Sequence, residues 1–137
     1  MPNLRKSFKN KTSRILSFGY KLVLSIRDST KIGRMTVYKA QAPNTLLVAK
    51  ASDLKFLVNS SDMAVGLSTY INRVAFDSEK ISPLLSICGR GGGQSIMLDI
   101  GANIDTIGLT ALAQGDVAEV WAFEPEPHNY SLLMSNI

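Results

Sequence analysis

Two acidic side chains stand at the ends of two apolar runs, where a nucleotide-binding sheet carries the groups that touch its ligand. The first run, residues 96–100, contains Asp99 and is followed at once by Gly101. The second run, residues 118–124, ends in Glu124. A carboxylate can accept hydrogen bonds from the vicinal hydroxyls of a ribose, and a glycine lets the backbone approach a ligand closely. These residue types in this order predict a site for a nucleotide-like ligand.

The elements that must position these groups are two strands joined by a helix. The segment between the apolar runs, residues 105–114, has the mixed composition of a helix pressed against a sheet. Because the connections are short and parallel strands need a crossover, this order predicts two adjacent parallel strands. The backbone N–H groups at the start of the helix would then face an anionic part of the ligand.

Three short segments resemble the FkbM-type methyltransferases, which are class I enzymes that use S-adenosylmethionine (SAM). The segments are Leu98-Asp99-Ile100-Gly101-Ala102-Asn103, Ala122-Phe123-Glu124-Pro125 and Asn129-Tyr130-Ser131-Leu132-Leu133. The resemblance covers roughly residues 60–137 and is strongest over 97–137. It implies an α/β, Rossmann-like class I methyltransferase fold. The chain is expected to hold the amino-terminal portion of that fold, with its first two parallel strands and their helices.

The resemblance also implies roles for seven cofactor-binding residues. They are Asp99, Gly101, Ala102, Asn103, Phe123, Glu124 and Pro125. Asp99 would lie near the ammonium of the amino-acid tail of SAM, and Glu124 would take the ribose hydroxyls. The loop residues would approach the tail, and the neighbours of Glu124 would flank the adenine. The family pattern has a glycine where this chain has Asp105, so we expect that carboxylate to weaken SAM binding unless it turns away and caps its own helix.

The implied activity is methyl transfer from SAM to a hydroxyl on a sugar or natural product, so the implied partner is a small-molecule or glycan acceptor. No catalytic residue, metal site or nucleic-acid partner is predicted.

Two alternative functions stay open. A nicotinamide- or flavin-binding Rossmann oxidoreductase would also place an acid on a ribose, and Glu124 follows Gly101 by 23 residues. A non-catalytic, truncated remnant of an enzyme is the other alternative.

Charge divides the chain unevenly. Residues 1–50 contain eleven Lys and Arg residues and one acid, whereas residues 51–137 contain four basic and ten acidic residues. Apolar residues recur at helical spacing over 4–26, with basic residues off that stripe. This pattern predicts a basic amphipathic helix that packs on the rest of the chain or makes peripheral contact with an anionic membrane. The apolar run is too short to span a membrane.

The remaining expectations concern location and domains. No signal-peptide cleavage pattern follows the basic segment, and the single cysteine, Cys88, favours a reducing compartment, so we expect a cytoplasmic protein. Residues 1–59 are predicted to form the basic helix and a small antiparallel meander, and residues 60–137 the start of the SAM-binding domain. The meander strands are expected at 35–39, 45–50 and 55–58. The last helix is expected to bury Tyr130, Leu133, Met134 and Ile137.

Overall fold

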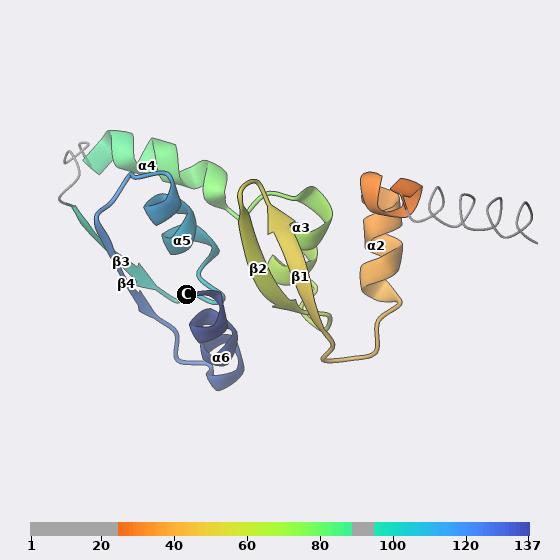
Figure 1. Cartoon of the computed structure of the whole chain (residues 1–137). Coiled ribbons are helices and arrows are strands. Elements are labelled where there is room, and N and C mark those ends of the chain that lie inside the picture. The colour runs from red at the N-terminus through yellow and green to blue at the C-terminus, as the bar shows by residue number, and fades with distance from the viewer. Residues whose placement is uncertain (1–24, 89–94) are drawn as a thin grey trace, which may run out of the picture. The chain divides into compact units, whose positions relative to one another are not determined.

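The computed structural model describes residues 25–88 and 95–137, and over these residues the chain is mixed α/β (Figure 1). The chain divides into two compact units, Met1–Val37 and Tyr38–Ile137. Residues 38–59 therefore belong to the same unit as residues 60–137. Most of the predicted amphipathic helix, residues 4–24, lies outside the described residues.

The predicted strand at 35–39 is wrong, because these residues belong to helix α2, Lys31–Lys39. Thr30 caps this helix: its hydroxyl accepts a hydrogen bond from a backbone N–H of the first turn at 3.0 Å. Arg34 and Tyr38 are four residues apart and both are buried, as helical periodicity allows. The β-branched and aromatic residues of this segment favoured a strand. The Thr30 cap and the four-residue spacing of the buried side chains are instead typical of a helix.

Strands β1 (Leu46–Ala51) and β2 (Leu54–Asn59) form an antiparallel pair with Leu46 opposite Asn59. The strands predicted at 45–50 and 55–58 are therefore confirmed, as a hairpin and not as part of a three-stranded meander. The turn is tight, and Ser52 adopts a left-handed backbone with φ of 51°. The inward side chains, Phe56 and Val58 among them, form a core with helix α3, Val65–Asn72.

A buried tyrosine joins the start of the second unit to this hairpin. The Tyr38 hydroxyl lies 2.5 Å from the carbonyl oxygen of Asn59 and 2.7 Å from that of Asp62. Burial raises the pKa of Tyr38, and the negative charge of Asp62 adds to the rise. The Asp62 carboxylate in turn accepts hydrogen bonds from the backbone N–H groups of Ala64 and Gly66, each at 2.8 Å. The end of β2 and the start of α3 are thus fixed around one phenol ring.

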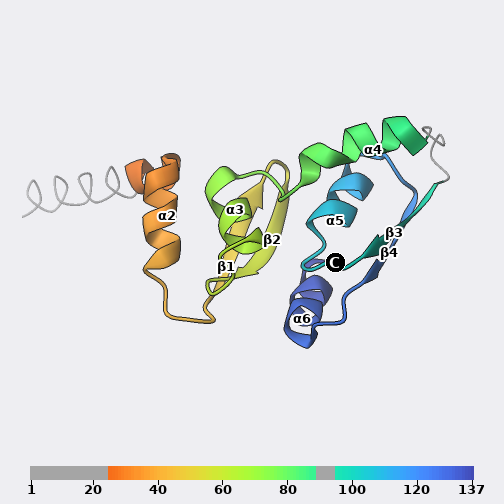
Figure 2. The ribbon, with the colours of Figure 1, turned by 180° about the vertical axis from the view of Figure 1, so that it is seen from behind.

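The second sheet contains strands β3 (Ile96–Ile100) and β4 (Glu119–Phe123), which pair in parallel. Helix α5, Thr106–Ala113, connects them and lies along one face of the pair (Figures 1 and 2). The predicted strand–helix–strand order is therefore confirmed. The short 3₁₀ helix η1 (Ser78–Lys80) and helix α4 (Ile81–Cys88) precede β3.

Helix α6, Pro127–Asn136, begins after β4, and the carboxylate of Glu126 caps it by accepting from the Asn129 N–H at 2.6 Å. The predicted buried stripe is mostly wrong. Leu132 and Leu133 are buried, whereas the other expected members are exposed: Tyr130, Met134 and Ile137. The helix is turned about its axis relative to the predicted orientation, so that Asn136 faces inward. Its side-chain oxygen accepts from the Leu57 N–H at 2.7 Å, and its amide nitrogen donates to the Ile104 carbonyl at 3.1 Å.

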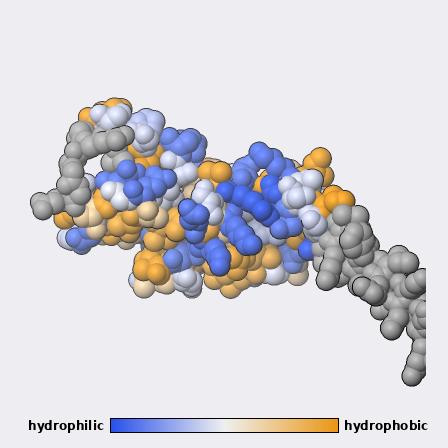
Figure 3. All heavy atoms as spheres, turned by 45° about the horizontal axis from the view of Figure 1, so that its top comes forward, coloured by the Kyte–Doolittle hydropathy of each residue, from blue (hydrophilic) through white to orange (hydrophobic). Residues whose placement is uncertain are grey.

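Hydrophobic side chains also reach the surface, as the orange spheres among blue ones in Figure 3 show. Among the described residues, no helix is both long enough and apolar enough to cross a membrane.

Candidate functional site

The loop between β3 and α5 lies against the end of β4. The backbone N–H groups of Gly101 and Ala102 both donate to the carbonyl oxygen of Phe123, at 2.8 and 3.1 Å. Gly101, Asn103 and Asp105 have left-handed backbones, with φ of 82°, 55° and 63°. Glycine adopts this conformation without cost and asparagine and aspartate tolerate it, so the loop turns sharply three times within five residues.

Glu124 holds this loop from the second strand. One carboxylate oxygen accepts a hydrogen bond from the Asn103 N–H at 2.7 Å, and the other accepts from the Glu126 N–H at 2.9 Å. Both acceptors are therefore oriented before any ligand arrives. Each carboxylate oxygen keeps a second lone pair, which a ribose hydroxyl could use.

An open hollow of about 600 Å³ lies beside this loop and has mainly apolar walls. Seven residues line it: Ile100, Gly101, Ala122, Phe123, Glu124, Pro125 and Tyr130. Four of them were predicted to bind the cofactor. Glu124 is the one charged residue among these seven, and a Cβ built on Gly101 would meet no atom within 4 Å. A hollow of this size, with apolar walls and one oriented acid, suits the adenosine part of a ligand.

Three residues that line this hollow were not predicted to bind the cofactor, namely Ile100, Ala122 and Tyr130. Tyr130 was assigned to the buried stripe of the last helix, yet it is 49% exposed and lines the hollow. Ile100 was read only as part of the first strand. The available signal was position, because Ile100 ends β3 and Tyr130 lies in the first turn of the helix that follows β4. Aromatic and aliphatic side chains there can flank a flat base.

Asp99 does not itself line this hollow, although its neighbour Ile100 and its strand partner Ala122 do, and it is coupled to Asp105. Burial raises the pKa of Asp99, while hydrogen bonds from the Asp105 carboxyl and the Gly108 backbone act in the opposite direction. Burial also raises the pKa of Asp105, to about 6, with a further increase from the charge of Asp99. The Asp105 carboxyl is thus the group of this pair that holds a proton longer as pH rises.

Neither expectation for Asp105 describes its position fully. The side chain is 3% exposed, so it does not project into solvent beside a bound ligand. It stands at the N-cap position of α5 but makes no side-chain capping hydrogen bond. One of its oxygens instead lies against Gly108, where an added methyl group would collide with it.

Two buried oxygens of this loop have no hydrogen-bond partner within the described part of the chain. They are the side-chain oxygens Oδ1 of Asn103 and Oδ1 of Asp105. A buried acceptor without a donor costs about 1–3 kcal/mol. Asn103 is only partly buried as a residue, so its side chain could turn Oδ1 outward and accept a hydrogen bond from a donor group on a ligand.

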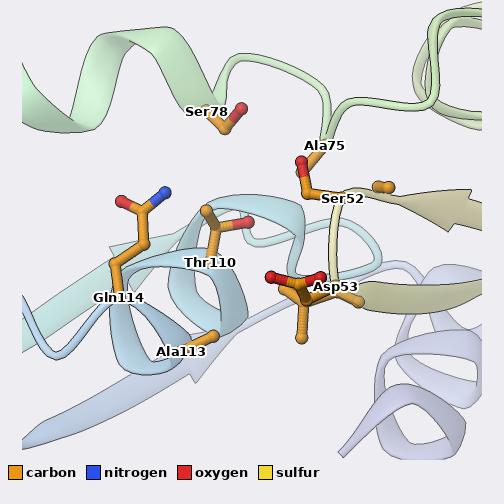
Figure 4. A pocket seen from close by; sticks show the side chains of 9 residues that line it. Ser52, Asp53, Ala75, Ser78, Thr110, Ala113 and Gln114 are labelled. Carbon is orange, nitrogen blue, oxygen red and sulfur yellow. The ribbon is translucent and has the colours of Figure 1, made fainter.

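A smaller hollow of about 140 Å³ lies among the β1–β2 turn, η1 and α5. Figure 4 shows Ser52, Asp53 and Gln114 among its lining side chains. Thr110, which also lines it, already donates to the carbonyl oxygen of Thr106 at 2.6 Å. Nucleotide-sized ligands occupy roughly 300–1,000 Å³, so this hollow does not compete as the site of such a ligand.

Comparison of the chain with protein-family models, with curated proteins and with solved structures found no match in any of the three. The geometry of the loop, of Glu124 and of the larger hollow therefore carries the functional assignment.

Proposed function

We propose that the unit Tyr38–Ile137 binds SAM in a Rossmann-like arrangement and that the protein is an FkbM-type methyltransferase acting on a hydroxyl of a sugar or natural product. One observation supports this most strongly. The loop that follows β3 and the acid that follows β4 are hydrogen-bonded to each other through the Asn103 N–H and the Glu124 carboxylate. Ligands of parallel sheets bind at this edge, beyond the carboxyl ends of the strands.

The larger hollow fits the adenosine of SAM. Glu124 can accept from both ribose hydroxyls, because each of its oxygens has one lone pair left after its backbone hydrogen bond. Phe123, Pro125 and Tyr130 give the hollow the apolar surface that an adenine needs. The absence of a side chain at Gly101 leaves space for the ligand at the turn.

The acidic pair and Asn103 fit the amino-acid tail. Asn103 Oδ1 is a buried acceptor without a donor among the described residues, and an ammonium group is a donor with three N–H bonds. Because Asp105 holds its proton more tightly than an ordinary aspartate, Asp99 is the member of the pair that carries the negative charge first. Below about pH 6, one carboxylate would then balance one ammonium without the cost of two adjacent charges.

SAM supplies a methyl group on a sulfonium, which is a good leaving group. The chain contributes binding and orientation: Glu124 fixes the ribose, and the loop after β3 fixes the tail. We assign no general base, because none of the described side chains of the hollow other than Glu124 is a carboxylate or an imidazole.

Asp105 argues against the oxidoreductase alternative. Dinucleotide-binding sheets place a pyrophosphate at the start of the helix after the first strand, where backbone N–H groups receive it. Here the residue at the start of α5 is a buried carboxyl next to Asp99. Negative charge from these two acids would oppose a pyrophosphate more strongly than the amino-acid tail of SAM, because the ammonium of that tail offsets its carboxylate.

Isothermal titration calorimetry with SAM and with NADH tests the proposal. We expect the folded chain to bind SAM and to bind NADH at least tenfold more weakly. Glu124→Gln should weaken SAM binding about tenfold or more, because the amide nitrogen cannot accept a hydrogen bond and faces a backbone N–H. Asp116→Asn removes another partly buried acid, which does not line the hollow, and should leave SAM binding unchanged.

Three results would contradict the proposal. Preference for NADH would favour the oxidoreductase. Absence of binding to either ligand, with an intact circular dichroism spectrum, would favour a non-catalytic remnant. Equal losses of affinity in Glu124→Gln and Asp116→Asn would show that SAM binds somewhere other than beside Glu124.

A further inference from the structure

We infer that the outer face of the β3–β4 sheet is an association surface and that it binds a second copy of this chain. This open sheet face is defined by five large apolar side chains, Ile96, Leu98, Ile100, Trp121 and Phe123. Each is more than half exposed, and Ile100 reaches 81%. Single exposed apolar residues are ordinary on protein surfaces, but a contiguous group of this size marks an interaction site.

The pairing of the strands makes the open sheet face continuous. The parallel register sets Leu98 opposite Trp121 and Ile100 opposite Phe123. Alternate residues of each strand point to the other side, where α5 covers the sheet. The exposed fractions rise and fall with this alternation along both strands, so one face is covered and the other is open. Among the residues that the structure describes, none packs across it.

The size of the open sheet face fits a dimer. Large side chains such as aromatic ones bury about 150–250 Å² each when fully covered, so five half-exposed large side chains present roughly 400–600 Å². Two such faces in contact would bury about 800–1,200 Å² in total, which lies at the lower limit of specific interfaces and suits a weak dimer. Two sheets can stack in this way at a spacing of about 10 Å, with the side chains of both faces interdigitating.

The charge on this face selects the symmetry. Glu119 is exposed at the start of β4, opposite Ile96 in the register, and accepts a hydrogen bond from the indole N–H of Trp121 at 2.5 Å. If the strands of two copies ran in the same direction, the two Glu119 carboxylates would lie at the same end and repel each other. A twofold axis perpendicular to the strands places them at opposite ends. We therefore infer an isologous dimer with antiparallel strands across the interface.

Sedimentation velocity on the full 137-residue chain, from about 1 to 200 µM, tests this inference. The wild-type chain should sediment as a dimer at the upper concentrations. Leu98→Lys places a charge at the centre of the face and should shift the chain to monomer, with the dissociation constant raised at least about a hundredfold. Ile100→Lys should act similarly, and because Ile100 is 81% exposed this change is tolerated by the fold.

Val48→Lys is the matched control. Val48 is also an exposed strand residue, at 56% against 59% for Leu98, but it lies on β1 of the other sheet. It should leave the dimer intact. The inference is overturned by a wild-type chain that stays monomeric at every concentration, by equal dissociation in Val48→Lys and Leu98→Lys, or by growth beyond a dimer. Because the assay contains no SAM and Leu98 lies outside the larger hollow, the outcome for Leu98→Lys does not depend on the proposed cofactor. Ile100 and Phe123 of the open sheet face also line that hollow, so Leu98→Lys is the variant that separates the two proposals.

Discussion

The buried acid at the start of α5 should make the stability of this protein depend on pH in an unusual direction. The pKa of Asp105 rises from 3.8 to about 6 on folding. At 1.36 kcal/mol per unit, this shift corresponds to about 3 kcal/mol. Because the folded state holds the proton more tightly, that stability is fully present below the unfolded pKa and is lost as pH rises through the folded value. Near neutral pH the ionised carboxylate destabilises the fold by nearly the whole amount.

Asp105→Asn removes the charge while keeping the size of the side chain and its tolerance of a left-handed backbone. We expect this variant to be more stable than the wild type by about 2–3 kcal/mol at about pH 7.5, and to differ little from it at about pH 4. Urea unfolding followed by circular dichroism measures both differences. Other groups titrate over this range, but they are common to both chains and cancel in the comparison.

The exposed acid Asp53 supplies the control, because Asp53→Asn should change stability by less than about 0.5 kcal/mol at either pH. Asp99→Asn is informative in a different way. Burial is the largest cause of the Asp105 shift and the charge of Asp99 the next, so this variant should reduce the pH dependence without abolishing it. Equal stabilisation by Asp105→Asn at both pH values would refute the reasoning.

Three further changes probe the same unit, each by urea unfolding unless stated otherwise. Gly108→Ala should destabilise the chain by about 2 kcal/mol or more, because its methyl group would collide with the Asp105 carboxyl and with Cγ1 of Val120. Asp105→Gly in the same chain should recover part of the loss, and absence of any recovery would contradict the collision with Asp105. Asn136→Ala should cost about 2–4 kcal/mol, because it leaves the Leu57 N–H and the Ile104 carbonyl without their partner; a loss below about 0.5 kcal/mol would be inconsistent with this clamp. Tyr38→Phe should cost about 1–3 kcal/mol, and an ultraviolet titration of the wild type should show one tyrosine that ionises only when the chain unfolds.

Local patterns were sufficient to predict the strand–helix–strand unit. The apolar runs at 96–100 and 118–124 are short, and the segment between them is long enough for one helix, so few arrangements other than a parallel pair were available. The position of Glu124 at the end of the second run was likewise readable. What the sequence could not show is that the carboxylate of Glu124 is occupied by the Asn103 and Glu126 N–H groups.

The wrong predictions have one physical cause: which side chains are buried depends on residues far away in the sequence. The segment 35–39 was read as a strand from its side chains, but Thr30 caps a helix and Tyr38 finds its partners more than 20 residues away. The last helix was given the wrong buried stripe, because the inward turn of Asn136 depends on acceptors and donors of β2 and of the loop before α5. Asp105 looked like a residue near the ligand, and its burial beside Asp99 is a result of tertiary packing.

The position of Trp121 gives this protein an optical reporter that needs no label. It is the single tryptophan of the chain, and its half-exposed indole lies at the centre of the open sheet face, one alternate position before Phe123 of the larger hollow. Indole emission shifts to shorter wavelength when water is excluded from the ring and is quenched when an acceptor stacks nearby. The wavelength of maximum Trp121 emission should therefore distinguish a monomer, whose open sheet face is in water, from a dimer, in which that face is covered.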